Sequence, residues 1–388
     1  MPVKNHLLIV CLSDVGRDPR VRRQIEWLKP HYRLSVLGFG QWQEDGIAAF
    51  LKRDRPNYGS LGIWGLVKIL TRLQVARFLP LDVYIHPIHP FPAIRTLAAE
   101  KFDAIIVNDA EPLPLAFELA QGAPVLFDAH EYYPLEAENS LTWRLFLQHY
   151  WTRLCRRYIP LCQGMTTVCQ SIAEEYQRRF KTPRMEVITN AHSFADIAPS
   201  PVDGKRVRLI HHGGAMPGRA LDRMMEMMDY VDSRFSLELM LTPSDPGYLA
   251  KLKRMAATRS NVKIIDPVSM PEIVGQINRY DMGVSLLPPV SFNDLHALPN
   301  KFFEFIQARL GIAVGPSVEM ARIVNQEGLG VVADDFNPAS LAAKLNALTS
   351  ADIVRFKENA AKAAKKYNAE RNGERFCELM AQVIASRR

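Results

Sequence analysis

The chain has little cysteine, and its cysteines are not spaced as a disulfide framework or a zinc site requires. Five cysteines occur in 388 residues, and no CxxC pair is present. Because closely paired thiols mark both kinds of site, we expect neither, and we expect a reducing, cytoplasmic environment. The five are Cys11, Cys155, Cys162, Cys169 and Cys377.

Long apolar runs and a dinucleotide fingerprint are also missing. No run approaches the roughly 20 apolar residues that a membrane-spanning helix needs. Residues 1–6 lead directly into an apolar strand, without the layout of a signal peptide. SDVGRDPR follows this first predicted strand in place of G-x-G-x-x-G, so dinucleotide binding gains no support.

The charge that is present has one prevailing sign. The formal net charge is +7, which favours an anionic partner such as a nucleotide diphosphate, a lipid headgroup or a nucleic acid. No DNA- or RNA-binding signature accompanies the charge, so we expect no nucleic-acid partner.

Short apolar runs alternate with helix-length amphipathic segments, in two successive blocks. This alternation predicts an α/β protein built from two doubly wound, Rossmann-like domains. The Pro-, Gly- and Ser-rich stretch 199–205 is typical of a linker between them. Strands are predicted at 6–12, 34–37, 104–107, 125–127 and 165–168, then at 207–211, 237–241, 262–265, 282–286, 312–314 and 330–332.

One segment of the second block predicts an anion-binding helix start. Pro299 cannot continue a helix from upstream, and Asn300 is a favourable N-cap residue. Lys301 and Glu304 lie three residues apart, hence on one face. A helix start suits a diphosphate, and a carboxylate one turn later suits a ribose diol. The alternative is an ordinary capped amphipathic helix.

A glycine pair and an arginine follow the first strand of the second block, in the run HHGGAMPGR. Gly213 and Gly214 would let the backbone approach a phosphate, and Arg219 would neutralise its charge. The alternative is a tight turn with a surface arginine. The two adjacent histidines lack a third ligand at suitable spacing, so we expect packing there and no metal site.

Polar side chains also end the strands of the first block. Asp128, His130 and Glu131 follow one strand, in the run DAHEYYP. Imidazole and carboxylate groups can bind sugar hydroxyls, and histidine titrates near neutrality. Asp109 and Glu111 follow the preceding strand, and ligands gather at this edge of an open α/β sheet.

Taken in order, these motifs resemble the retaining GT-B glycosyltransferases of the GT4-like group (glycosyl transferases group 1). The resemblance implies two Rossmann-like domains that face each other across a cleft. The N-terminal, acceptor-side domain would comprise residues 1–197 with a returning helix at 370–388. The C-terminal, nucleotide-sugar domain would comprise 198–369.

The resemblance also implies roles for residues of the donor site. Glu304 matches the second glutamate of a Glu-x7-Glu motif and would hold the donor ribose. His296 stands where the first glutamate is usual, which leaves that contact with the donor sugar open. Arg219 and Lys301 would stabilise the leaving diphosphate, and His130 would position the donor sugar. Donor contacts are further implied for Gly16, Gly213, Gly214, Pro267, Val268 and Asn300, and acceptor contacts for Asp109, Glu111 and Glu131.

The resulting hypothesis is a hexosyltransferase that acts with retention and needs no metal or other cofactor. Its acceptor would be a glycan or lipid-linked glycan of surface polysaccharide synthesis. Two alternatives stay open: a nucleotide-sugar 2-epimerase of the same fold, and a non-catalytic nucleotide-binding scaffold, which the histidine at 296 keeps in play.

Two stretches, 51–80 and 143–159, interleave lysine and arginine with aromatic and aliphatic residues. Basic amphipathic helices of this composition bind anionic interfaces, so we expect peripheral contact with the inner face of a membrane. The alternative is that both bury their apolar faces in the first domain.

Overall fold

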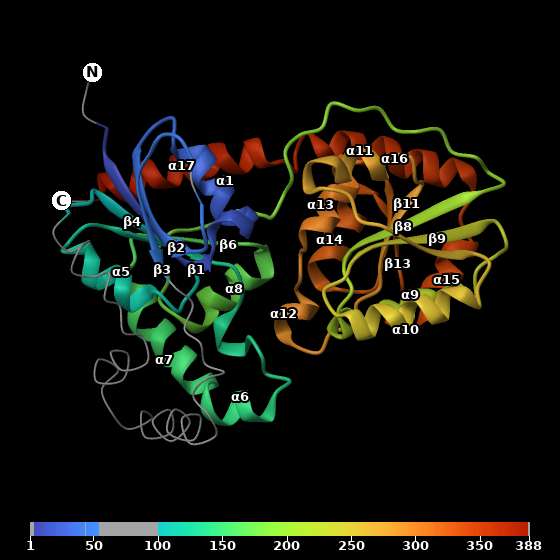
Figure 1. Cartoon of the computed structure of the whole chain (residues 1–388), viewed down its shortest axis with the longest axis horizontal. Coiled ribbons are helices and arrows are strands. Elements are labelled where there is room, and N and C mark those ends of the chain that lie inside the picture. The colour runs from blue at the N-terminus through green and yellow to red at the C-terminus, as the bar shows by residue number, and fades with distance from the viewer. Residues whose placement is uncertain (1–3, 43, 54–99, 387–388) are drawn as a thin grey trace. The chain divides into compact units, whose positions relative to one another are not determined.

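The computed structural model describes residues 4–42, 44–53 and 100–386 (Figure 1). These residues form two compact units. Unit 1 comprises the described residues up to Ile188, together with Ser291–Asn293 and the chain from Gly373 onward. Unit 2 comprises Thr189–Val290 and Asp294–Asn372.

Unit 1 is built on a parallel sheet that, in the described part of the chain, has the order β3-β2-β1-β4-β5-β6-β7. Its central strands are buried on both faces, as a continuous run such as HLLIVCL predicts. The strands are β1 (His6–Asp14), β2 (Arg33–Phe39), β3 (Ile47–Arg53), β4 (Ala104–Asn108), β5 (Val125–Ala129), β6 (Gly164–Thr167) and β7 (Met185–Val187).

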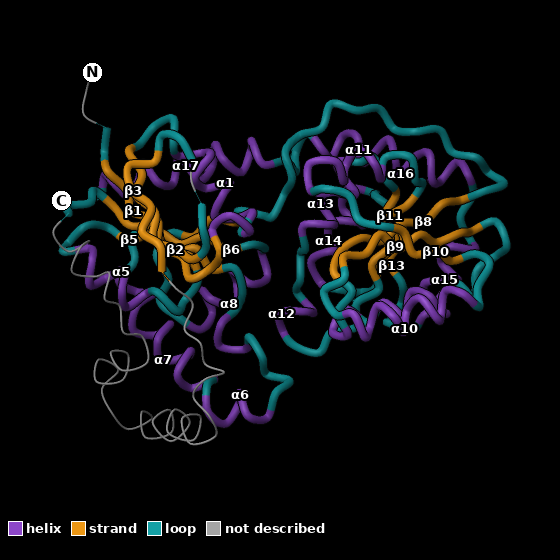
Figure 2. Tube along the Cα trace, viewed as in Figure 1, coloured by secondary structure: helices purple, strands orange, loops and turns teal. Residues whose placement is uncertain are grey.

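Helices cover both faces of this sheet (Figure 2). α1 and α17 share one face, where the rings of Trp27 and Phe376 lie 5.7 Å apart. Asp18 caps α1 by accepting hydrogen bonds from the backbone N–H groups of Arg20 and Val21. The helices are α1 (Pro19–Leu28), α5 (Leu113–Ala120), α6 (Leu141–Phe146), α7 (Gln148–Tyr158), α8 (Gln170–Arg179) and α17 (Ala369–Ala385), with the 3-10 turns η1 (Val15–Arg17), η3 (Tyr133–Leu135) and η4 (Ile159–Leu161).

Unit 2 is built on a second parallel sheet, of order β10-β9-β8-β11-β12-β13. Its apolar core joins these strands to the flanking helices. The strands are β8 (Val207–Gly214), β9 (Phe235–Thr242), β10 (Val262–Ile265), β11 (Met282–Ser285), β12 (Gly311–Val314) and β13 (Gly330–Val332).

Two groups of helices enclose the unit 2 sheet, with α9, α10 and α15 together and α11, α13, α14 and α16 together (Figure 1). They are α9 (Leu221–Met227), α10 (Pro246–Ala257), α11 (Ile273–Ile277), α13 (Asn300–Gln307), α14 (Val318–Glu327), α15 (Pro338–Asn346) and α16 (Ser350–Ala364). The short α12 (Phe292–Leu295) and the 3-10 turns η5 (Pro217–Arg219) and η6 (Met270–Glu272) complete the described elements.

The chain that enters unit 2 is fastened to the end of α13. Gln307 accepts a hydrogen bond from the backbone N–H of Ala195 at 3.0 Å and donates to the carbonyls of Ala364 and Tyr367. The buried guanidinium of Arg309 donates to the carbonyl of Ala195. The division between the units accordingly falls after Ile188, earlier in the chain than the predicted linker at 199–205.

Every predicted strand is present, and the basic stretch 143–159 lies mostly in two helices, α6 and α7. Leu147 separates α6 from α7, and Trp143, Tyr150 and Leu154 are buried. Of the other basic stretch, residues 51–53 end β3 and residues 54–80 lie outside the described residues. None of the helices in the described part of the chain combines the length and the hydropathy that crossing a bilayer requires.

Candidate functional site

The end of β8 brings the predicted glycine pair to the edge of the unit 2 sheet. The strand continues three residues beyond its predicted end and includes both glycines, so the prediction of a loop starting after His211 is wrong. Gly213 has a φ of 136°, and a Cβ there would lie 3.2 Å from Nζ of Lys301. The backbone conformation therefore favours glycine at position 213, and a Cβ there would also crowd the end of the lysine side chain.

Arg219 ends the 3-10 turn η5 that follows this strand, and it is exposed. The next residue, Ala220, has left-handed backbone angles, with φ 44° and ψ 45°. This turn places Arg219 at the rim of a pocket in unit 2.

Helix α13 faces the end of β8 with its polar side. The helix starts at Asn300, and no side chain caps it, so the prediction of Asn300 as the N-cap is wrong. Oδ1 of Asn300 is buried and has no hydrogen-bond partner within the described residues. Lys301 and Glu304 occupy one face, as their spacing predicts. Lys301 reaches His211, and Glu304 reaches His212.

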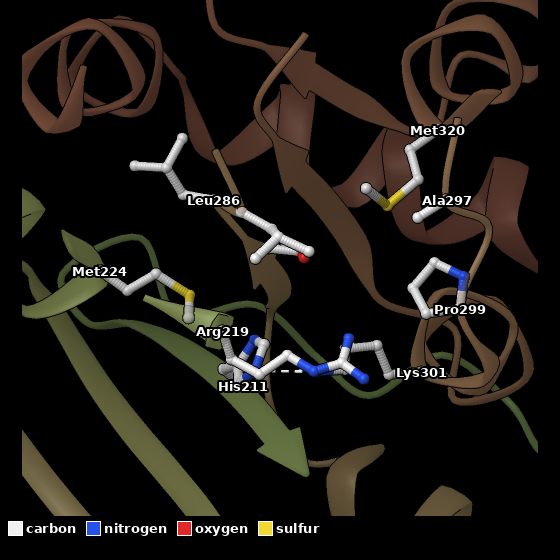
Figure 3. A pocket seen from close by; sticks show the side chains of 10 residues that line it. His211, Arg219, Met224, Leu286, Ala297, Pro299, Lys301 and Met320 are labelled. Carbon is white, nitrogen blue, oxygen red and sulfur yellow. Dashed lines mark hydrogen bonds between the residues drawn. The ribbon is translucent and has the colours of Figure 1, made fainter. Parts of the chain in front are cut away.

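Figure 3 shows the pocket that these elements form. Its cationic side consists of Arg219 and Lys301, beside His211. The opposite wall is apolar. It is lined by Met224, Leu286, Leu287, Ala297, Pro299 and Met320, with Ser285 adding a hydroxyl. Within the described residues, neither Arg219 nor Lys301 forms an ion pair, so their charge is available to an anion.

Burial sets the charge states around this pocket. Desolvation, reinforced by Arg219, lowers the pKa of Lys301 to about 7, although Glu304 opposes the shift. Burial and the nearby Lys301 hold the pKa of His211 well below its usual range and lower that of His212 to about 3. Both imidazoles are therefore neutral at physiological pH.

Unit 1 places His130 in a separate buried network at the end of β5. Nδ1 lies 3.1 Å from Asp109, and Nε2 lies 3.3 Å from Asp128 and 3.1 Å from Oδ1 of Asn108. Burial alone would lower the pKa of His130, but the two carboxylates outweigh it and raise the pKa. Both ring nitrogens thus face protein oxygens.

Asp128 is the anchor of this network. Its carboxylate is fully buried and accepts hydrogen bonds from the Arg20 guanidinium at 2.6 and 2.7 Å, from Gln24 at 2.5 Å and from Thr166 at 2.6 Å. Burial opposes ionisation, yet Arg20 and the hydrogen bonds hold the pKa of Asp128 well below its usual range. These contacts give Asp128 a structural role.

The remaining predicted residues are placed as follows. Asp109 has a φ of 70° and accepts a hydrogen bond from the Tyr133 hydroxyl. Gly16 lies in η1, Glu131 is exposed, and Glu111 is half-buried. In unit 2, His296 follows α12, while Pro267 and Val268 lie in the irregular chain after β10. None of these three lines the pocket, whereas Arg219 and Lys301 both do.

The two histidines of β8 are the residues that the sequence left without a function. Their adjacency to the glycine pair was the available signal. Their partners on α13 lie about 90 residues further along the chain. No local sequence pattern predicts contacts between residues so far apart in the chain.

Residues 50–193 match the profile of Glycosyltransferase Family 4. No curated protein matches the chain.

Solved structures resemble the chain over nearly its whole length at low sequence identity. A sucrose-phosphate synthase from Thermosynechococcus elongatus superposes with a TM-score of 0.71 at 11% identity, covering 99% of this chain and 100% of its own. HepE from Anabaena, in complex with UDP, gives 0.68 at 13% identity, covering 97% and 99%. A UDP-forming α,α-trehalose-phosphate synthase from Burkholderia vietnamiensis gives 0.66 at 13% identity, covering 98% and 100%.

Proposed function

We propose that this chain, which has the GT-B fold, is a glycosyltransferase that transfers a hexose from a UDP-sugar to a glycan or lipid-linked glycan with retention. The structural neighbours that are solved with UDP or described as UDP-forming support uridine as the donor base. Synthesis of a surface polysaccharide is the proposed setting.

The cation pair of Arg219 and Lys301 is the observation that carries this proposal. Both line one pocket, next to the start of α13, and neither is neutralised by a carboxylate of the described residues. A diphosphate leaving group develops negative charge in the transition state, and fixed cations stabilise that charge. The arginine adds a planar fork of donors, and the helix start adds free N–H groups.

We propose a mechanism that uses neither a carboxylate nucleophile nor a metal. Among the described residues, the lining of the pocket contains no aspartate or glutamate that could form a covalent glycosyl-enzyme intermediate. A phosphate oxygen of the donor accepts the acceptor's proton in our proposal, which is compatible with retention. The charges of Arg219 and Lys301 take the role that a divalent cation plays in other transferases.

Glu304 is proposed to accept hydrogen bonds from the ribose diol, and His130 to act as an imidazolium beside the donor sugar. Asp109, Glu111 and Glu131 are proposed to serve the acceptor. A 2-epimerase of the same fold is the alternative, and it would turn over the donor without an acceptor.

Thermal unfolding with UDP, GDP, CDP, dTDP and ADP tests the proposal. A ligand that binds the native state alone raises the melting temperature by mass action. We expect UDP to give the largest rise. A larger rise with another diphosphate would change the base, and no rise with any of the five would contradict a nucleotide site. Donor hydrolysis without acceptor, compared with turnover in its presence, then separates transferase from epimerase.

We propose that the surface around α6 and α7 binds an anionic membrane, which suits a lipid-linked acceptor. Leu141, Leu145 and Leu161 expose 61%, 50% and 51% of their area, and Arg144 and Arg156 are exposed nearby in the chain. Apolar groups flanked by arginines insert into the headgroup region of anionic bilayers.

Sedimentation with phosphatidylglycerol vesicles tests this surface. Leu141→Ser/Leu145→Ser should reduce binding several-fold, and Arg144→Gln/Arg156→Gln should do the same at low salt only. Arg254→Gln, an exposed arginine of α10, is the control. Equal binding by all variants would contradict a membrane role for this surface.

A further inference from the structure

His211 is held between a backbone carbonyl and the amine of Lys301, as the dashed line to Lys301 in Figure 3 indicates in part. Nδ1 lies 2.7 Å from the carbonyl oxygen of Val284 in β11. Nε2 lies 3.0 Å from Nζ of Lys301 in α13. The imidazole is 3% exposed, so its orientation is set by these two contacts and by packing.

The carbonyl determines the tautomer of His211. Because a carbonyl oxygen only accepts, Nδ1 carries the proton and donates it to Val284. Nε2 of the neutral ring then has a free lone pair, and this lone pair accepts a hydrogen bond from Lys301. His211 therefore orients the amine of Lys301 and leaves its positive charge in place. A carboxylate at the same position would neutralise that charge.

The groups around Lys301 make its protonation sensitive to an anion. Arg219 from η5 opposes the positive charge, and Glu304 on the same helix favours it. His211 and His212 from β8 are neutral. The pocket residues contributed by β11, by the chain after it and by α14 carry no charge. A bound diphosphate would place negative charge next to Lys301 and so favour its protonated form.

We propose that His211 is a positioning residue that directs Lys301 at the donor diphosphate, and that donor binding completes the protonation of the lysine by uptake from solvent. This inference rests on the proposed nucleotide-diphosphate function of the pocket. The unliganded lysine is shared between amine and ammonium near neutral pH, and the diphosphate selects the ammonium. The proton moves from buffer to Nζ, and no bond of the donor is made or broken in this step.

Calorimetric titration in two buffers of different ionisation enthalpy measures the proton uptake. UDP-glucose is the first probe because its diphosphate is a diester and does not titrate near neutrality. With a pKa of about 7 in the free protein, Lys301 should take up about half a proton per site at pH 7 and close to one at pH 8. Lys301→Arg, whose cation does not titrate, should abolish the uptake at both pH values.

Two substitutions at His211 separate its two hydrogen bonds. In His211→Asn the amide can replace Nδ1 toward Val284 but offers Lys301 no acceptor. In His211→Gln the longer amide reaches the position of Nε2 and offers an oxygen to Lys301. We expect His211→Asn to weaken UDP-glucose binding about tenfold and to move the midpoint of proton uptake to lower pH. His211→Gln should stay close to the wild type in both readouts, and melting curves verify that each variant is folded.

His192→Gln is the matched control, since the His192 side chain makes a local contact with the backbone carbonyl of Ser193; it should change neither readout. Binding without any buffer dependence at pH 7 and 8 would overturn the proton uptake and leave the nucleotide site intact. Equal behaviour of His211→Asn and His211→Gln would overturn the positioning role. No binding of UDP-glucose, and no diphosphate that raises the melting temperature, would overturn both this inference and the proposed function.

Discussion

The carboxylate of Glu304 lies 3.2 Å from Nε2 of His212, and both side chains are almost completely buried. Burial and Lys301 lower the pKa of the imidazole to about 3, so the carboxylate faces a neutral ring. Its charge is therefore not cancelled by His212 and can accept hydrogen bonds from a ligand.

Glu304→Ala should weaken UDP binding about 10- to 100-fold, because two charge-assisted hydrogen bonds to the ribose diol are lost. Calorimetry measures the loss. Titration with 2′,3′-dideoxy-UDP supplies the control, since a ligand without the diol should not distinguish the variant from the wild type. Equal weakening for both ligands would place Glu304 outside the ribose contact.

Arg219→Ala should lower kcat about 100-fold, since one fixed cation no longer opposes the charge that develops on the leaving diphosphate. The affinity for uridine, which has no phosphate, should not change. Steady-state kinetics and uridine titration give the two values, with Arg254→Ala on α10 as the control. A parallel loss of kcat and uridine affinity would indicate a structural role instead.

Asp128→Asn should destabilise the protein by about 3–5 kcal/mol, because a buried guanidinium loses its charged partner. Urea unfolding measures the difference. Asp229→Asn breaks an ion pair with Arg259 at 2.7 Å in which Asp229 is exposed, and should cost less than about 1 kcal/mol. Similar losses for the two variants would contradict the anchoring role of Asp128.

His130 should make the stability of the protein depend on pH. Its folded pKa is raised above the usual 6.5, so its contribution to the free energy of unfolding is fully present below pH 6.5. That contribution is lost as pH rises through the folded pKa. The difference in stability between wild type and His130→Gln should therefore shrink over this interval. A difference independent of pH would mean that the ring is neutral in the fold.

Ala220→Gly should stabilise the protein by about 1 kcal/mol, since a left-handed backbone conformation penalises any Cβ. Gln121→Gly tests the same effect at the end of α5 in unit 1, where φ is 47°. Melting temperatures report both changes. If only the Gln121 variant were stabilised, the contacts of the Ala220 methyl group would contribute more stability than the left-handed backbone conformation costs.

The βα alternation and the positions of most strands were predictable because continuous apolar runs mark strands buried on both faces. Two strands were not predicted. β7 has only three residues, all half-buried, and β3 lies at the sheet edge with alanines in its centre. Helix α15 was also missed, although Asn337 and Pro338 provide a cap and a first-turn proline.

The candidate site was predictable in its individual residues but not in their pairing. Arg219, Lys301 and the glycine at 213 were indicated by turn and helix-start patterns. The structure brings Arg219 and Lys301 to one pocket, and Gly213 lies close to the amine of Lys301. The contacts of His211 with Lys301 and of His212 with Glu304 depend on the juxtaposition of β8 and α13. These contacts follow from tertiary packing, which local sequence patterns do not predict.

The hydrogen bonds that join Ala195 to Gln307 and Arg309 bear on how this protein can be recombined with proteins of the same fold. A chimera joined within 199–205 would separate Ala195 from both partners and leave buried donors unpaired. Crossovers after Ile188 and after Asn372 would keep these bonds within a single parent. The segment exchanged in a chimera should therefore include the extended chain that precedes β8.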